Sequence, residues 1–76
     1  MEKRGYIKQF FGFDELLFEG EYLNGERNGK GKEYYFDFEN KFDEKIKFDG
    51  EYLNGKRNGK GKEYYDNGSL AFEDEY

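Results

Sequence analysis

The sequence predicts an all-β protein in which about six strands form one antiparallel meander. The first indication is an internal repeat, because residues 18–35 read FEGEYLNGERNGKGKEYY and residues 48–65 read FDGEYLNGKRNGKGKEYY. The second is the alternation of large residues with small or charged ones inside each copy, the period of two that is typical of a strand. The third is the Asn-Gly pairs in the middle of each copy, which favour positive φ and mark turns. Each copy therefore reads as a β-hairpin.

The repeats divide the chain into two full units with a half unit at each end. The full units are residues 18–47 and 48–71, and FEDEY at 72–76 matches the start of a third unit. Residues 5–17 fit the same frame as the second half of a degenerate unit. The first full unit is longer than the second, so we expect extended strands around a turn at 36–47, forming a junction hairpin that projects beyond its neighbours.

A strand register can be proposed for each hairpin. Three pairs of residues face each other in it: Tyr22 with Gly31, Phe18 with Tyr35, and Glu21 with Lys32. One face then carries rings and glycines, and the other carries acids and lysines. A glycine weakens a strand unless a ring covers it. We therefore expect Tyr22 and Tyr52 to point toward Gly31 and Gly61.

The composition indicates what holds such a sheet together and which functions it excludes. The chain of 76 residues contains eight tyrosines and nine phenylalanines but no valine, so the rings must supply most of the buried area. Cysteine and histidine are both absent. This excludes disulfides and cysteine metal sites, and it removes the commonest catalytic base and metal ligand. We expect no cofactor and no metal.

The charge pattern bears on partners and location. The net charge is −5 and the acids and bases are interspersed, which opposes attraction to nucleic acid and to anionic membranes. Residues 1–18 lack the apolar segment of a signal peptide, and no apolar run reaches transmembrane length. We therefore expect a cytoplasmic protein that does not bind nucleic acid.

At the repeated segments the chain resembles a MORN (membrane occupation and recognition nexus) repeat protein. The family pattern begins with an aromatic residue, an acid, glycine, an acid and an aromatic residue, and continues with Asn-Gly, a basic residue and Gly-x-Gly. Tyr22 and Tyr52 stand where the family often has tryptophan, and Asn28 and Asn58 where it often has histidine. The resemblance implies an elongated, curved, single-layer sheet with one hairpin per repeat. It implies no particular activity.

Two sharper interpretations of the basic loops were weighed. GKRNGKGK lacks the Ser or Thr and the following helix that a nucleotide-binding P-loop requires. Arg27 and Arg57, together with the neighbouring lysines, could contact anionic lipid, although nearby acids favour charges that pair across strands. The acidic residues form no constellation suited to catalysis, so we expect no enzyme.

The aromatic face is the strongest functional signal, because large apolar patches usually mark interaction sites. We expect a non-enzymatic module that binds a partner protein, with acidic flanks giving selectivity. The expected contacts are the rings of both repeats and of the junction: Phe18, Tyr22, Tyr35, Phe36, Phe38, Phe42, Phe48, Tyr52 and Tyr65. One alternative is a small acidic inhibitor, such as an immunity protein, an antitoxin or a phage-encoded blocker of a nuclease or other basic enzyme. A scaffold that binds anionic lipid and a homodimer formed through edge strands or rings are further alternatives.

Overall fold

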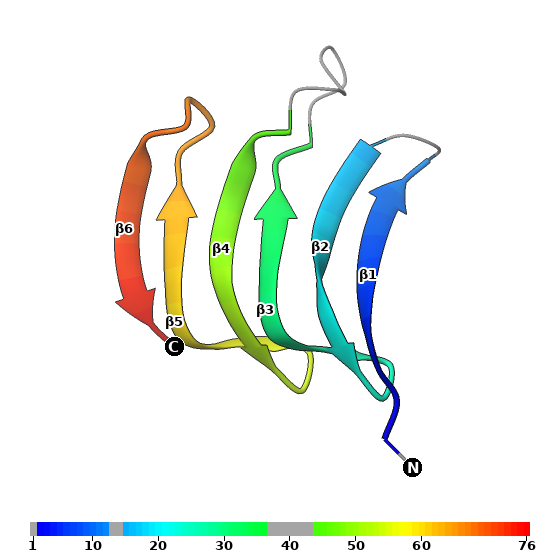
Figure 1. Ribbon diagram of the computed structural model, residues 1–76. Coiled ribbons are helices and arrows are strands. Elements are labelled where there is room, and N and C mark those ends of the chain that lie inside the picture. The colour runs from blue at the N-terminus through cyan, green and yellow to red at the C-terminus, as the bar shows by residue number, and fades with distance from the viewer. Residues whose placement is uncertain (1, 13–14, 37–43) are drawn as a thin grey trace.

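A computed structural model of the chain describes residues 2–12, 15–36 and 44–76 (Figure 1). Six strands form one antiparallel sheet in chain order: Arg4–Phe11 (β1), Glu15–Leu23 (β2), Glu26–Tyr34 (β3), Ile46–Leu53 (β4), Lys56–Tyr64 (β5) and Leu70–Glu75 (β6). The sheet measures 42 × 31 × 12 Å, and its thickness corresponds to a single layer. The strands bend along their length (Figure 1). The predicted all-β meander of six strands is confirmed.

The first Asn-Gly pair of each repeat forms the hairpin turn. Asn24 and Gly25 have φ values of 49° and 85°, and Asn54 and Gly55 have 51° and 82°. Two consecutive residues with positive φ define a type I′ turn, whose twist matches that of the strands it joins. The hairpin turns therefore form where the sequence predicts them.

The register predicted within each hairpin is wrong, by two residues at the open end of the hairpin and by four residues beside the turn. Near the open end of the hairpin, Phe18 lies opposite Glu33, and the glycines at 20 and 31 face each other. Tyr22 pairs with Arg27, so residues 28–30 all lie opposite residue 21. The second Asn-Gly pair of the repeat causes this shift, because it forms a β-bulge instead of a turn.

The bulge is stabilised by a glutamate side chain and recurs in the second repeat. Gly29 has a φ of 97°, and the Glu21 carboxylate accepts a hydrogen bond of 2.6 Å from the backbone N–H of Lys30. Gly59 has a φ of 72°, and the corresponding bond from Lys60 to Glu51 is 2.9 Å long. The glutamate thus satisfies a donor that the bulge removes from the ladder.

The core consists of rings that lie against pairs of facing glycines. Phe18 and Phe48 have 0% of their surface exposed, and Tyr52 has 4%. A Cβ added at Gly20 would lie 2.6 Å from the Gly31 Cα and 2.9 Å from the Phe18 Cζ. Rings do cover the glycines as expected, but the ring over Gly20 and Gly31 is that of Phe18, which is four residues before Tyr22.

The tyrosines contact different glycines from those predicted. A Cβ added at Gly31 would lie 3.0 Å from a ring carbon of Tyr52, and one added at Gly61 would lie 3.3 Å from a ring carbon of Tyr76. Tyr52 therefore packs on Gly31 of the preceding repeat and not on Gly61. The ring that contacts Gly61 is that of Tyr76. In β1, Ile7 occupies the position that Gly31 has in β3 and Gly61 has in β5, and it packs against the core.

The half units at the two ends follow the same spatial frame as the full repeats. Three tyrosines face three equivalent glycines across neighbouring strands: Tyr22 with Gly5, Tyr52 with Gly29, and Tyr76 with Gly59. β1 is therefore equivalent to β3 and β5, and β6 is equivalent to β2 and β4.

The junction between the repeats is less extended than predicted in the part that the structure describes. β3 ends at Tyr34, and β4 begins at Ile46. One backbone hydrogen bond of 2.9 Å from Tyr35 to Lys45 continues the ladder, but Tyr35 and Phe36 do not lie in a strand. The prediction of longer strands is wrong at these residues, and residues 37–43 lie outside the described part of the chain.

Substitution of Gly20 by alanine should destabilise the protein by about 1–3 kcal/mol, because the new methyl group would overlap the backbone of Gly31 and the Phe18 ring. Gly5→Ala is the matched control, since nothing lies within 4 Å of a Cβ at Gly5. Urea unfolding monitored by circular dichroism measures both variants. Equal stability of the two variants would show that the glycine pair is not required for packing.

Candidate functional site

The rings of the core form a continuous row along one face of the sheet, which we call the aromatic face. The centroid distances are 5.3 Å from Phe18 to Tyr52, 5.7 Å from Tyr52 to Phe48 and 5.6 Å from Phe48 to Tyr76. All three contacts are edge-to-face, a geometry that contributes about 0.5–1.5 kcal/mol per pair beyond area burial. Tyr52 therefore joins the phenylalanines of the two repeats.

Two arginines cover the outer side of this row. The guanidinium carbon of Arg27 lies 3.9 Å from the centroid of the Phe18 ring, and that of Arg57 lies 4.0 Å from the centroid of the Phe48 ring. Contacts of this kind contribute about 0.5–2 kcal/mol each. Each phenylalanine is thus enclosed between glycines on one side and a guanidinium group on the other, which explains how a single-layer sheet buries its rings completely.

Polar side chains hold the arginines in place. The Arg57 Nε donates to Glu33 over 2.9 Å, and its Nη1 donates to Glu63 over 2.8 Å. Arg27 donates in the same way to the Gln9 side chain, with its shorter bond at 2.8 Å. Gln9 therefore replaces, in the degenerate half unit, the glutamate that the full repeat provides.

The Glu33 carboxylate is the centre of this network. It accepts hydrogen bonds from the Tyr52 hydroxyl and from Arg57. Burial acts to raise the pKa of Glu33, but these hydrogen bonds outweigh it, and the pKa lies below its ordinary value. Burial and the same carboxylate raise the pKa of Tyr52. Both groups therefore keep their neutral-pH protonation states, and the network is suited to structural support and not to proton transfer.

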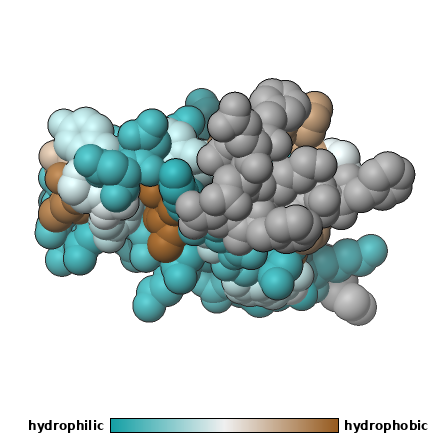
Figure 2. Space-filling view, turned by 90° about the horizontal axis from the view of Figure 1, so that it is seen from above, coloured by the Kyte–Doolittle hydropathy of each residue, from teal (hydrophilic) through white to brown (hydrophobic). Residues whose placement is uncertain are grey.

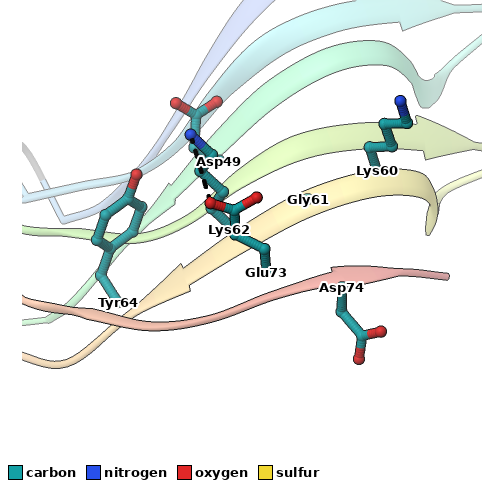
Figure 3. A pocket seen from close by; sticks show the side chains of 7 residues that line it. All are labelled: Asp49, Lys60, Gly61, Lys62, Tyr64, Glu73 and Asp74. Atoms are coloured by element: carbon teal, nitrogen blue, oxygen red, sulfur yellow. Dashed lines mark ion pairs between the residues drawn. The ribbon is translucent and has the colours of Figure 1, made fainter.

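The opposite side of the sheet, which we call the charged face, carries a row of alternating charges. Register partners along this row run across all six strands: Lys8, Glu19, Lys32, Asp49, Lys62 and Glu73. Figure 3 shows the β6 end of the row, with Lys62 between Asp49 and Glu73; the Lys62 Nζ lies 4.0 Å from the Glu73 carboxylate. The predicted pairing of Glu21 with Lys32 is wrong, because the bulge places Glu19 opposite Lys32.

Two shallow hollows lie on the charged face at equivalent positions of the two repeats. One, of about 380 Å³, is lined by residues that include Lys30, Gly31 and Lys32. The other, of about 320 Å³, is lined by residues that include Lys60, Gly61 and Lys62 (Figure 3). Acidic side chains line both hollows beside the lysines, so neither presents a surface of one charge.

Tyrosine hydroxyls complete the hydrogen bonding on the charged face. Glu19 accepts hydrogen bonds from Tyr34 and Tyr6. The bond from Tyr34 is the main factor that lowers the pKa of Glu19 below its ordinary value. Burial and Glu19 together raise the pKa of Tyr34. These are again fixed hydrogen bonds that tie β1, β2 and β3 together.

Exposed apolar side chains gather instead at the end of the sheet where β1, β3 and β5 finish (Figure 1). We call this region the loop end and define it by six residues: Phe10, Phe11, Tyr35, Phe36, Tyr65 and Leu70. Five of them are exposed, whereas Tyr35 is half-buried and its hydroxyl donates to the Tyr64 carbonyl over 2.6 Å. Phe11 and Tyr65 each have 57% of their surface exposed, and the rings of Phe11 and Phe36 meet edge-to-face at 4.9 Å. Figure 2 looks onto this end and shows hydrophobic side chains among hydrophilic ones.

Seven of the nine contact residues predicted from the sequence are described by the structure, and they fall into three groups. Phe18, Phe48 and Tyr52 are core residues, so the expectation that these rings form an open binding surface is wrong; the arginines cover them. Tyr22 is half-buried beside β1. Three of the predicted residues belong to the loop end: Tyr35, Phe36 and Tyr65. Phe38 and Phe42 lie outside the described residues.

Sequence reasoning missed three members of the loop end: Phe10, Phe11 and Leu70. The signal was present, because Phe10 and Phe11 align with Tyr64 and Tyr65 in the repeat frame. Residues that share a position in the repeat share an end of the sheet. The Phe10–Phe11 pair was therefore a candidate for the same surface as Tyr65.

The described residues contain no group of three or more acidic, histidine or cysteine side chains positioned to hold a metal ion. Within the same part of the chain, no helix is long and apolar enough to span a membrane.

The geometry defines a β-repeat protein whose hairpins are joined through an aromatic row. A family model described as MORN repeat matches residues 18–38 and 48–70, which is more than half of the chain. The chain therefore belongs to the MORN repeat family. No curated protein and no solved structure matches it. MORN repeats are generally modules for interaction with proteins or membranes.

Replacement of Glu33 by glutamine tests the network through pH. The folded-state pKa of Glu33 is lowered, so its charge stabilises the protein above the unfolded-state pKa of about 4.3, and this contribution is lost as the pH falls through the folded-state value. Glu33→Gln should destabilise the protein at pH 7 by about 1–3 kcal/mol, and the difference from the wild type should shrink below pH ~4.

Urea unfolding at pH 7 and at pH ~3 measures this difference. Glu26→Gln is the matched control, because Glu26 is exposed beside the turn. A difference between Glu33→Gln and the wild type that stays constant over this pH range would contradict the role assigned to the Glu33 charge.

Proposed function

We propose that the chain is a non-enzymatic protein-interaction module and that its partner contacts the loop end. The observation that carries this proposal is the gathering of exposed apolar and aromatic side chains at one end of a small sheet. An exposed patch of this kind usually marks an interaction site. Phe11, Phe36 and Tyr65 are its most useful anchors, because aromatic rings bury a large area with few rotatable bonds.

The two faces of the sheet are less suitable for a partner. On the aromatic face, the phenylalanines are fully buried beneath Arg27 and Arg57. On the charged face, acids and lysines alternate and compensate one another. The loop end carries five of the nine large apolar side chains that are exposed among the described residues.

A hollow beside the loop end offers a place for an anchoring side chain of the partner. It has a volume of about 500 Å³ and lies between the start of β4 and the β5–β6 turn, with Ile46, Tyr64 and Asn67 among its lining residues. Glu44 and Lys45 also line it, so a polar group of the partner would meet charges of both signs there. Hot-spot side chains typically fill pockets of this kind at the centre of an interface.

The net charge of −5 favours a basic partner, because long-range attraction accelerates encounter. A chain without cysteine suits the reducing cytoplasm, where we propose that it acts. We do not advance lipid binding through Arg27 and Arg57, because both guanidinium groups are engaged with rings and side chains of the chain itself.

Affinity capture from the cells that produce the protein tests the proposal. A variant with Phe11→Ser, Phe36→Ser and Tyr65→Ser should lose at least about ten-fold of the partner captured by the wild type. Leu53→Ser is the matched control, because Leu53 is exposed to a similar degree beside the Asn54–Gly55 turn at the other end of the sheet.

Circular dichroism should show that the triple variant keeps its sheet. Equal capture by the triple variant and the wild type would overturn the proposed surface. If the captured protein is a basic enzyme that loses its activity in the complex, the module acts as an inhibitor; if it is a structural protein, the module acts as a scaffold.

A further inference from the structure

The two edge strands direct alternate backbone groups away from the sheet, although the outward N–H of Glu75 donates to the Asp74 side chain over 2.8 Å. In the sheet, β1 and β6 each have one neighbour. Tyr76 and Gly59 exchange two backbone hydrogen bonds, of 2.6 and 3.0 Å. Because bonded and non-bonded pairs alternate in an antiparallel ladder, Glu73 and Glu75 direct their N–H and C=O groups away from β5.

The edge strand β1 also directs alternate backbone groups away from the sheet. The Lys3 carbonyl accepts a hydrogen bond of 2.8 Å from the backbone of Asn24, so Lys3 faces β2. Alternation then directs the backbone groups of Tyr6 and Lys8 outward. Each edge therefore offers outward donors and acceptors at the strand positions that belong to the charged row.

The charged row distinguishes the two edges. Lysines occupy β1, β3 and β5, and acids occupy β2, β4 and β6. The row ends in Lys8 at one edge and in Glu73 at the other. A strand that continues the alternation beside β6 must bring a lysine, and one beside β1 must bring an acid. Like charges directly opposite each other in a sheet are destabilising.

Pairing of like edges is disfavoured on these grounds. Two copies of β6 would bring together the acidic run of Glu73, Asp74 and Glu75. Two copies of β1 would bring together the basic residues Arg4 and Lys8. The chain itself supplies the complementary strand for each edge, because β1 is equivalent to β3 and β5, and β6 to β2 and β4.

We propose that the occupant of each edge is a second copy of this chain, arranged head to tail, with β6 of one copy antiparallel to β1 of the next. The register follows that of β2 and β3 and places Glu73 opposite Lys8, as Glu19 lies opposite Lys32. This contact completes a repeat and is heterologous, so it can continue from copy to copy. Phe10, Phe11 and Leu70 of the loop end lie on the same two strands. The two proposals are distinguished by variants of Lys8 and Glu73, which change the edges and leave every residue of the loop end in place.

The junction is weaker than an internal hairpin. In this register Asp74 and Ile7 would face each other, whereas Gly20 and Gly31 do so within a repeat. Side chains at both positions prevent Phe72 from lying over the strands as Phe18 does. The association should therefore be concentration-dependent, with a Kd between about 10 µM and about 1 mM.

Analytical ultracentrifugation of the full chain over that range tests the proposal. The weight-average mass of the wild type should rise with concentration. Lys8→Glu alone places acid against acid at the junction, Glu73→Lys alone places lysine against lysine, and both variants should remain monomeric. In an equimolar mixture, Glu73 of the first variant can face Lys8 of the second, and the new lysine of the second can face the new glutamate of the first. Both junctions between unlike variants are complementary, so the weight-average mass of the mixture should rise with concentration.

Lys56→Glu and Asp66→Lys are controls with the same changes in net charge away from the edges, and both should associate like the wild type. Circular dichroism verifies the fold of every variant. A wild type that stays monomeric up to ~1 mM overturns the proposal. The proposal is also overturned if either edge variant alone associates as strongly as the wild type. It is overturned as well if the mixture of the two variants stays monomeric.

Discussion

The packing of Phe18 and Phe48 on pairs of facing glycines is the constraint on which the other features depend. A single layer has no opposing sheet to bury a ring, so the ring must lie on the backbone of its own strands. Only glycine leaves room for this, since a Cβ at Gly50 would lie 2.6 Å from the Phe48 Cζ and 2.7 Å from the Gly61 Cα. The exposed side of each ring then requires a cover, which the arginines supply.

This arrangement makes each repeat depend on its neighbours. Arg57 covers Phe48 within one hairpin, but it also donates two hydrogen bonds to Glu33 on β3 of the preceding repeat. Tyr52 likewise packs on Phe18 of the first repeat and donates to Glu33. Stability in such a protein is a sum of repeat and interface contributions. The geometry that recurs in both repeats therefore uses the rings internally and leaves contacts with other molecules to the loop end and the edges.

The sequence was sufficient for the strand number, the hairpin turns and the recurrence of rings over glycines. It was insufficient for the register, because two Asn-Gly pairs occur in each repeat with the same local signal. Asn24–Gly25 forms a turn, whereas Gly29 opens a bulge that is stabilised by a hydrogen bond from the Lys30 backbone N–H to the Glu21 carboxylate. The cover over the rings was also missed, because Arg27 reaches Phe18 only in the shifted register. A binding surface was consequently assigned to rings that are buried.

The most direct test of ring packing on glycine is the proton NMR spectrum of the glycines. A proton that lies over the face of an aromatic ring is shielded by the ring current and resonates upfield of its usual position. The account predicts upfield-shifted Hα resonances for the four glycines beneath the phenylalanines, Gly20, Gly31, Gly50 and Gly61, and ordinary values for Gly5 and Gly12, near which nothing lies within 4 Å of an added Cβ. Ordinary shifts at all six glycines would contradict it.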